Sequence, residues 1–550
     1  MKKTIIILLA AFVYSSCQKK LNESIKSSLT PSFFQTQQGF LAGLNAAYAG
    51  NRNDYGPETG VFAFTIPGTD EFRIANGTRT AAVNNYSSSY NSANEFSQDN
   101  WNNCYTMINT CNGLVDYGAA ITGISDASKT EMIAEAKFLR ANYYFRLVQF
   151  FGDVTLNQHF LSNPTTAAIR TSKADVYNFI IQDLKDASVG LPASPQTTGV
   201  LPGKATAAAA RHLLSKVYLT RGWSSAAQPD DFSNAFTTAT ALINDAPSIG
   251  IGLLPDFASV FTPKNENNKE SLFTVQYSAD QTYGGPNNNI MNHFFVTNYT
   301  TVPCIVRNYT DGRPYNWIRG TKWLYDTAFA DKVDDTRYYK SFQQVWHVTT
   351  AGTYTFHGVS YHVNVGDTAI FMPGYDVADA VISSKPYQLM PPRTYTAYLY
   401  PTMTKFLDPN RTINVNQNST RPLIIYRLAE TYLIAAEAAL MMGQPANAVP
   451  YVNAIRARAA FNGGNAAAMT VTTGDITLDF ILDERTRELC GEQMRWPDLV
   501  RTQKLLERVQ KHDDYQAYLN IIPKDTLRPI PLTQIDAVIT GTPYPQNPGW

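Results

Sequence analysis

"RPLIIYRLAETYLIAAEAALMMGQPANAVPYVNAIRARAAF" runs from Arg421 to Phe461, and its pattern sets the class of the fold. From Arg421 to Met442 nearly every side of the predicted helix carries apolar or alanine residues, so this helix is expected to be buried between two neighbours. Gly443 ends it, and Pro445 lies at the start of the next helix, Ala446 to Phe461. The stretch therefore predicts a tight helical hairpin.

Apolar stripes at helical spacing cover much of the remaining chain. In Glu131 to Phe150 apolar or small residues recur in steps of three and four, and Gly152 then stops the helix. Similar stripes run through Asn100 to Tyr117, Lys173 to Leu191, Gly203 to Arg221 and Ser233 to Asp245. Such hairpins resemble tetratricopeptide units, but no strict repeat period is found. We predict a mostly α fold built on a degenerate, tetratricopeptide-like array.

The segment between about residues 262 and 420 has a different composition, rich in Asn, Gly, Thr, Pro and Tyr. Within it, Gly352 to Pro373 alternates polar and apolar residues around Gly358 and Gly366, which predicts a small β-meander. We expect one domain from 29 to 550, with a helical scaffold at 29–260 and 421–550. The loop-rich lobe at 262–420 is where recognition is expected, because irregular loops commonly carry binding residues.

The N-terminus has the features of an exported, lipid-anchored protein. Two lysines precede a nine-residue apolar run from Ile5 to Val13, which is too short to cross a bilayer. Small serines then lead to Cys17, so residues 1–16 are predicted to be a lipoprotein signal peptide and Cys17 the lipidation site. Cleavage by the ordinary signal peptidase is the alternative. Residues 17–28 are polar and patternless and are expected to form a tether.

Composition excludes some partners and leaves others open. Lys plus Arg and Asp plus Glu are equal at 45 each, so no net field attracts nucleic acid. Besides Cys17 there are four cysteines, for which we expect buried free thiols: Cys104, Cys111, Cys304 and Cys490. Their spacing is not that of a metal site, and no cofactor is predicted.

A set of longer motifs carries a family signature, in this order along the chain: "EAKFLRANYYFRLVQFFGDVTL" (Glu135 to Leu156), "RLAETYLIAAEAALMMG", "YVNAIRARA", "ILDERTRELCGEQMRWPDLVRTQKL", "LRPIPLTQID" and the closing "YPQNPGW". Together they resemble the SusD/RagB family of outer-membrane nutrient-binding lipoproteins. The resemblance implies a surface-exposed, lipid-anchored body that sits as a lid on a TonB-dependent SusC-type transporter. It also implies non-catalytic capture of an oligosaccharide or similar nutrient.

The densest charged stretch, Asp483 to Arg501, is the candidate location for catalytic carboxylates. Glu484, Glu488 and Glu492 lie four residues apart, on one face of the predicted helix. In glycosidases a pair of carboxyl groups serves as acid and base, so these three glutamates are candidates for that role. Interleaved arginines favour salt-bridged packing instead, because cationic neighbours stabilise the ionised carboxylate. A surface glycan hydrolase using these groups remains the first rival function. The second rival is a protein-interaction scaffold, since helical arrays commonly bind peptides.

Three histidines form a possible metal site in the strand-like segment: His347, His357 and His362. A turn at Gly358 would bring only the last two close together. A metal would then need a third ligand and supporting groups that the sequence does not identify, so we predict ordinary histidines and no metal.

Two loop stretches combine aromatic and hydrogen-bonding side chains as a sugar site requires. The first, "GTDEFRIANGTR" (Gly68 to Arg79), offers Asp70, Arg73 and Asn76; the second, "YTDGRPYNWIRGTKWLYD" (Tyr309 to Asp326), offers Tyr315, Trp317 and Trp323, with support from Tyr283. We predict that these seven residues contact the ligand. The alternatives are packing of the rings against the helices and turn capping by the polar residues. Trp101 and Trp496 lie in helical motifs and are expected in the core.

Overall fold

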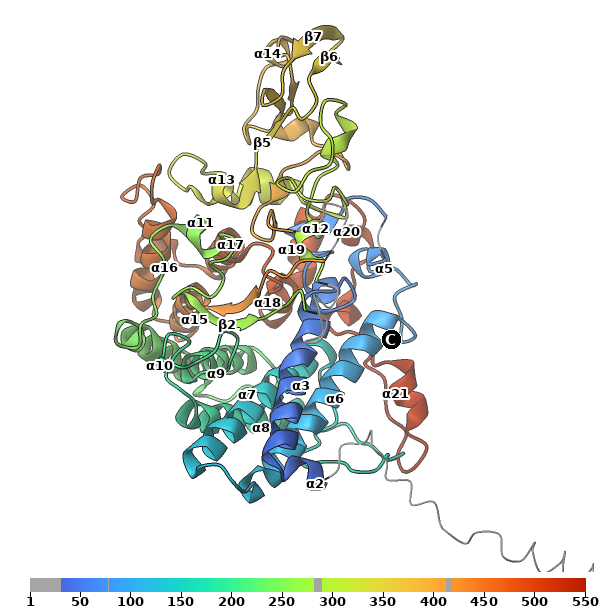
Figure 1. The fold of residues 1–550 in the computed structure, drawn as a ribbon, viewed down its shortest axis with the longest axis vertical. Coiled ribbons are helices and arrows are strands. Elements are labelled where there is room, and N and C mark those ends of the chain that lie inside the picture. The colour runs from blue at the N-terminus through green and yellow to red at the C-terminus, as the bar shows by residue number, and fades with distance from the viewer. Residues whose placement is uncertain (1–30, 78, 281–288, 412–417) are drawn as a thin grey trace, which may run out of the picture.

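The computed structural model describes residues 31–77, 79–280, 289–411 and 418–550 (Figure 1). The predicted signal peptide, the tether with Cys17, and Tyr283 all lie outside the described residues. In the part of the chain that is described, no helix is both long and apolar enough to span a membrane.

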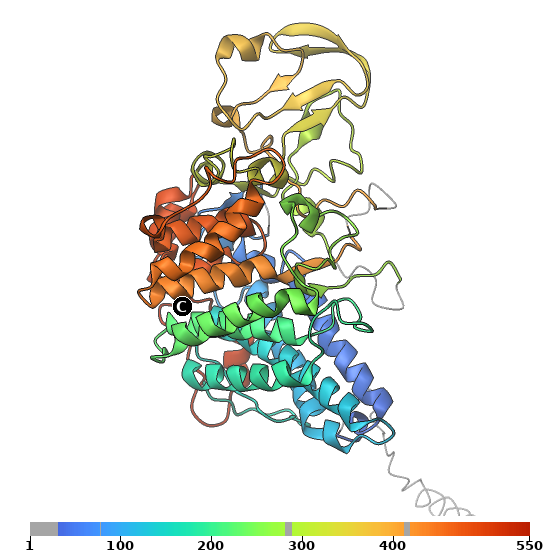
Figure 2. The same ribbon diagram turned by 90° about the vertical axis from the view of Figure 1, so that its left-hand side faces the viewer.

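The long helices pack on one another largely in chain order. They are α3 (Gln37–Tyr55), α6 (Glu95–Tyr117), α7 (Asp126–Phe151), α8 (Lys173–Gly190), α9 (Ala207–Gly222), α10 (Asp231–Asp245), α15 (Leu428–Met441), α16 (Pro445–Ala459) and α17 (Leu478–Leu489). Each helix from α3 to α10 packs on the next, and α10 then packs on α15, which packs on α16. The helical segments on either side of the irregular middle are thus joined into one stack (Figure 2). The predicted mostly α architecture is confirmed.

The hairpin of α15 and α16 forms as predicted, except at its beginning. Residues Leu423–Arg427 are not helical: they form strand β11, which pairs antiparallel with β2 (Ser271–Val275). The run Ile424, Ile425 and Tyr426 favours a strand because β-branched and aromatic side chains suit a pleated surface. Within α15 itself the side chains are buried almost all round, as expected for a helix between two neighbours.

Helix α7 shows how local signals set the other boundaries. It begins at Asp126, five residues before the predicted start, because the Ser125 side chain caps it by accepting a hydrogen bond from the Ser128 amide. It ends at Gly152, whose φ of +73° lies in the region that favours glycine.

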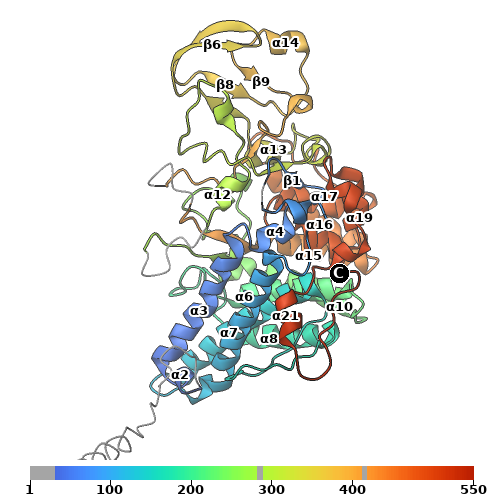
Figure 3. The same cartoon turned by 90° about the vertical axis from the view of Figure 1, so that its right-hand side faces the viewer.

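Short strands are confined to the β1–β3 pair, the β2–β11 pair and the irregular lobe. They are β1 (Phe72–Ile74), β3 (Ile318–Gly320), β4 (Phe342–Gln343), β5 (Val345–His347), β6 (Gly352–Phe356), β7 (Val359–Val363), β8 (Thr368–Phe371), β9 (Gln388–Leu389) and β10 (Thr402–Met403). Strands β5 to β9 lie at one end of the molecule, far from α7 and α8 (Figure 3).

The predicted β-meander is only partly correct. Strands β6 and β7 form a hairpin, but β8 pairs with β5 and β9 instead of β7. The chain is redirected after β7 by a turn in which the Asp367 amide donates to the Asn364 carbonyl, with Gly366 at a φ of +95°. The turn therefore moves β8 away from the hairpin and into a second sheet.

Short helices connect these parts. They are α2 (Pro31–Phe34), α4 (Val61–Thr65), α5 (Ala81–Asn84), α11 (Phe257–Val260), α12 (Met291–Phe294), α13 (Arg337–Ser341), α14 (Asp379–Ser383), α18 (Arg495–Arg501), α19 (Leu505–His512), α20 (Ala517–Asn520) and α21 (Leu532–Ala537). The core predictions for Trp101 and Trp496 are confirmed, since both are buried. The four described cysteines are likewise buried free thiols.

Candidate functional site

The two stretches predicted to bind ligand lie side by side. Strand β1 comes from the first and β3 from the second, and they pair antiparallel with Arg73 opposite Arg319. The pairing continues past the strands, because the Ala75 amide donates to the Trp317 carbonyl at 2.7 Å and the Thr321 amide donates to the Glu71 carbonyl at 2.9 Å. Segments that are about 240 residues apart in the sequence thus pair along their length. We call this paired region the β1–β3 edge.

Two of the predicted aromatic residues stack on each other at this edge. The rings of Tyr315 and Trp317 have centroids 4.6 Å apart, and Trp317 also stacks on buried Phe294 of α12 at 5.5 Å. The Arg313 guanidinium carbon lies 4.4 Å from the Tyr315 ring centroid, within the range of a cation–π contact. We call Phe294, Trp317, Tyr315 and Arg313 the ring stack. It runs from the core to partly exposed side chains.

The backbone between the two rings is turned and not extended. Asn316 has a φ of +50°, in the left-handed region, and strand β3 begins only at Ile318. Here the intervening Asn316 is buried, and its side-chain amide donates to the Ala397 carbonyl at 2.8 Å. The Asn316 amide also donates to the Val296 carbonyl at 2.9 Å. These bonds hold the loop that carries Tyr315 and Trp317.

The polar residues of the first stretch differ in how far they are exposed to solvent. Asn76 is exposed at the end of β1. Arg73 is largely buried, where its Nε donates to the Asp514 carboxylate at 2.6 Å and its guanidinium lies over Tyr515.

The expectation for Asp70 is wrong, because this residue is fully buried. Its carboxylate accepts hydrogen bonds from Arg495 Nε at 2.7 Å and Nη2 at 2.5 Å. Burial alone raises the pKa of Asp70, but Arg495 and Arg508 outweigh burial, so the pKa is lowered. Asp70 is an ionised structural group that holds β1 against α18 and α19.

The expectation for Trp323 is wrong for the same reason. Only 7% of the residue is exposed, and its ring packs on His512 with centroids 4.7 Å apart. The guanidinium groups of Arg495 and Arg508 lie 5.8 Å and 5.5 Å from the ring centroid. The structure thus brings Tyr315 and Trp317 together, leaves Asn76 exposed beyond the same edge, and removes Asp70 and Trp323 from the site.

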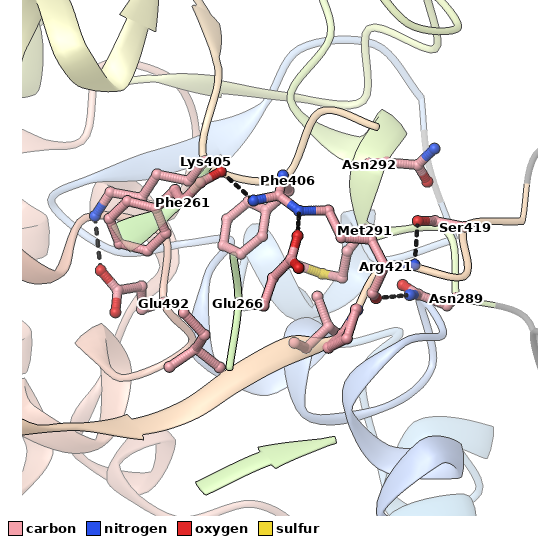
Figure 4. Close-up of a pocket in the computed structure, with 13 residues that line it drawn as sticks. Phe261, Glu266, Asn289, Met291, Asn292, Lys405, Phe406, Ser419, Arg421 and Glu492 are labelled. Atoms are coloured by element: carbon pink, nitrogen blue, oxygen red, sulfur yellow. Dashed lines mark hydrogen bonds and ion pairs between the residues drawn. The ribbon is translucent and has the colours of Figure 1, made fainter. Parts of the chain in front are cut away.

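A small cavity lies beside α12, which carries Phe294 (Figure 4). Its volume of about 20 Å³ is enough for a single water molecule and not for a sugar. The charged groups on its wall are paired: Lys405 with Glu492 at 2.7 Å, and Arg421 with Glu266. The Asn289 side chain donates to the Arg421 carbonyl at 3.0 Å. These contacts fix the support of the ring stack and do not form a ligand site.

A larger hollow of about 630 Å³ lies between α3, α7 and β2. Aliphatic side chains such as Leu41, Met132 and Leu201 form much of its wall. The polar groups there contact each other: the Tyr48 hydroxyl donates to Glu135 at 2.5 Å, and Lys204 pairs with Glu135 at 2.8 Å. Asn45, Arg52 and Gln276 also line this hollow and offer donors, but Phe273 is buried and Tyr48 is the one partly exposed ring among the described residues that line it. The ring stack has two partly exposed rings and is therefore the better glycan surface.

The carboxylates of the rival hydrolase site are buried in an ion network. Glu484 contacts Arg337, Arg456 and Arg487 at 2.8 to 3.0 Å, and Glu488 contacts Arg337 at 3.1 Å, Arg427 at 2.6 Å and Arg458. Glu492 pairs with Arg427 and Lys405, both at 2.7 Å.

Electrostatics in this network oppose acid catalysis. Burial raises the pKa of Glu488, but Arg458, Arg427 and Arg337 outweigh it and lower the pKa to about 2. The pKa of Glu484 is shifted in the same direction by Arg337, Arg487 and Arg456. A general acid needs a raised pKa and access to substrate, and these groups have neither. The predicted salt-bridged packing is confirmed.

The histidines of the outer lobe make local contacts. His347 Nδ1 lies 3.0 Å from the Gly366 carbonyl oxygen, and His357 Nε2 lies 3.0 Å from that of Tyr387. His362 sits opposite Thr353 in the β6–β7 hairpin. Across residues 31–77, 79–280, 289–411 and 418–550, no group of three or more His, Cys, Asp or Glu residues has the arrangement to hold a metal ion.

Comparison with known proteins identifies the family. The model of the SusD family matches residues 260–550, more than half of the chain. The chain belongs to the SusD family. A second SusD-like model, described as "Starch-binding associating with outer membrane", matches residues 21–219, so the family description associates such proteins with the outer membrane.

Relatives of this SusD-family chain match it over nearly its whole length. SusD-like protein P2 of Formosa agariphila is 27% identical over 568 residues, covering 100% of this chain and 99% of that protein. A SusD homolog from Bacteroides thetaiotaomicron superposes with a TM-score of 0.76 at 21% identity, covering 94% of this chain and 98% of that one. A laminarin-binding SusD-like protein superposes with a TM-score of 0.69 at 22% identity, covering 94% and 100%. These structural likenesses confirm the SusD-like fold.

Proposed function

We propose that this SusD-family chain captures a glycan on its ring stack and delivers it to a SusC-type TonB-dependent transporter without cleaving it. The observation that carries the proposal is the pair of partly exposed, stacked rings of Tyr315 and Trp317. A pyranose has an apolar face that packs on an aromatic ring and hydroxyls at its edge that bond to polar groups. Exposed Asn76 and the Arg313 guanidinium supply such groups nearby. The name of the laminarin-binding neighbour supports a glycan as the ligand.

The decisive experiment replaces each ring in turn. We expect Tyr315→Ala and Trp317→Ala each to weaken binding about 10-fold, or about 1.4 kcal/mol, because each removes one of the two partly exposed rings of the ring stack. Affinity electrophoresis against laminarin, starch, xylan, mannan and pectin measures this. Trp317→Phe keeps a flat ring and should retain most of the affinity.

Controls separate lost binding from lost folding. Trp317 packs on Phe294, so circular dichroism and the melting temperature must show that the alanine variants remain folded. Tyr375→Ala removes an aromatic residue that is 57% exposed on the outer lobe and should leave mobility unchanged. Wild-type retention by both alanine variants, across every glycan that the wild type binds, would rule out the ring stack as the site. Accumulation of shorter oligosaccharides during incubation with the purified protein would instead favour the hydrolase.

Anchoring is part of the same proposal and rests on the sequence around Cys17. We propose that the Cys17 thiol carries the lipid that holds the body at the outer face of the outer membrane. In a bacterial host that exports the chain, Cys17→Ala should move the protein from the membrane pellet to the soluble fraction. A Cys17→Ala variant that still sediments with membranes and resists carbonate washing would contradict lipid anchoring through this residue.

A further inference from the structure

Arginine residues from two distant segments gather around Tyr315. Arg313 lies over the ring, as described above. Arg307 and Arg411 are also near enough, with Arg313, to oppose the effect of burial on the pKa of the Tyr315 hydroxyl. Arg411 is 8% exposed, and its Nε donates to the Asp408 carbonyl at 3.0 Å. Arg313 therefore lies directly over Tyr315, and the charges of Arg307 and Arg411 also act on the Tyr315 hydroxyl.

Arg307 has hydrogen-bonding capacity that the described residues do not use. The Arg307 side chain is partly exposed, while its Nε and Nη2 atoms are covered and have no hydrogen-bond acceptor among the described residues. Burial lowers the pKa of Arg307, and the charge of Arg313 lowers it further. Covered donors that lack a hydrogen-bond partner cost free energy, because they have lost their hydration. An acceptor that binds to these Arg307 atoms would remove this cost.

Two carboxylates lie in the same neighbourhood, and both are engaged by neutral donors. Asp311 accepts from the side-chain amides of Gln343 at 2.6 Å and Asn308 at 2.7 Å. Asp408 accepts from the Ser419 hydroxyl at 2.6 Å and the Asn410 amide at 3.0 Å. This neighbourhood thus contains three arginines and two carboxylates. Its formal net charge is positive, although that of the whole chain is zero.

We propose that the glycan recognised at the ring stack carries an anionic group, a uronate carboxylate or a sulfate ester, which Arg307 and Arg313 bind beside Tyr315. This inference rests on the proposed function, since it names the class of glycan for the same site. The sugar packs against the exposed edge of the Tyr315–Trp317 pair, and the planar guanidinium groups donate to the oxygens of the anion. Arginine suits this role because its fork of N–H donors matches a carboxylate or sulfate.

The test compares ligands that differ only in charge. One pair is hexagalacturonate and its methyl ester, and the second is an ι-carrageenan oligomer and its desulfated form. Isothermal titration calorimetry should show the acidic member of at least one pair binding about 10-fold more tightly or better. That preference should decrease between 50 and 500 mM NaCl, because salt screens charge but not ring stacking. The pair that shows the preference identifies the anion as carboxylate or sulfate.

Variants then assign the preference to the arginines. Arg307→Gln and Arg313→Gln should each reduce the acid-over-neutral affinity ratio about 10-fold, and Arg307→Gln should leave the affinity for the neutral member unchanged. Arg393→Gln is the matched control, since Arg393 is an exposed arginine that pairs with Asp376 and Asp379 on the outer lobe.

Two outcomes separate this inference from the proposed function. If neutral glycans bind through Trp317 and neither pair shows a charge preference, the inference is overturned while glycan capture stands. If no glycan of either charge binds and Trp317→Ala changes nothing, the proposed function fails and the inference fails with it.

Discussion

Glu488→Gln is expected to lower the free energy of unfolding by about 3–5 kcal/mol, because it leaves three buried arginines without their shared carboxylate. Arg337, Arg427 and Arg458 all contact Glu488, and all four residues are largely or fully buried. For a chain of this length the entropy of unfolding is on the order of 1 kcal/mol per kelvin. The melting temperature at pH 7 should therefore fall by about 3–5 °C, which differential scanning calorimetry resolves.

The same substitution has a predictable pH dependence. Glu488 has a pKa of about 2 in the folded protein against an ordinary value of 4.5. A depressed folded pKa contributes stability above pH 4.5 that is lost as the pH falls from 4.5 towards 2. The shift corresponds to about 3 kcal/mol. The difference in stability between wild type and Glu488→Gln should therefore shrink across this window.

A matched control makes the same chemical change on the surface. Glu507 is exposed and pairs with Lys504 at 2.8 Å, so Glu507→Gln should shift the melting temperature by less than about 1 °C. Equal, small effects of the two substitutions would show that the arginines around Glu488 relax at little cost.

Helical features of this fold could be predicted because their signals are local. The period of apolar residues located α7 to within five residues at its start, and Gly152 marked its end. The sequence pattern wrongly placed β11 in a helix, because the signal that makes it a strand is not local. Ile424 to Arg427 continue the apolar pattern of α15, and only the pairing with β2, about 150 residues earlier, makes them a strand. A pairing partner that distant leaves no signal in the local sequence.

The same distinction applies to the candidate site. Tyr315 and Trp317 are two residues apart, so the sequence already placed them in one aromatic stretch, whereas their stacking depends on the positive φ of Asn316 between them. Asp70 and Trp323 were misassigned because their burial depends on Arg495 and Arg508, which follow at great distance in the chain. Arg411 was missed because it comes to Tyr315 from almost 100 residues away.

Glu71→Gln is expected to do the reverse of Glu488→Gln and stabilise the protein at alkaline pH. Glu71 is 3% exposed, and burial raises its pKa to about 7; Arg495 opposes this shift and Asp70 adds to it. A raised folded pKa means that the group contributes most stability below pH 4.5, and that this stability is lost as the pH rises through 7. The loss approaches about 3 kcal/mol at pH 8.

Glutamine is neutral at every pH and nearly isosteric, so it avoids the cost of ionising a buried carboxyl. We expect the melting temperature of Glu71→Gln to exceed that of the wild type by about 2–3 °C at pH 8 and to match it near pH 4.5. The backbone bond from the Thr321 amide to the Glu71 carbonyl is untouched, so the β1–β3 edge that carries the ring stack should be preserved. A variant less stable than wild type at pH 8 would mean that the 3.4 Å contact between Glu71 and Arg495 outweighs the burial of the charge.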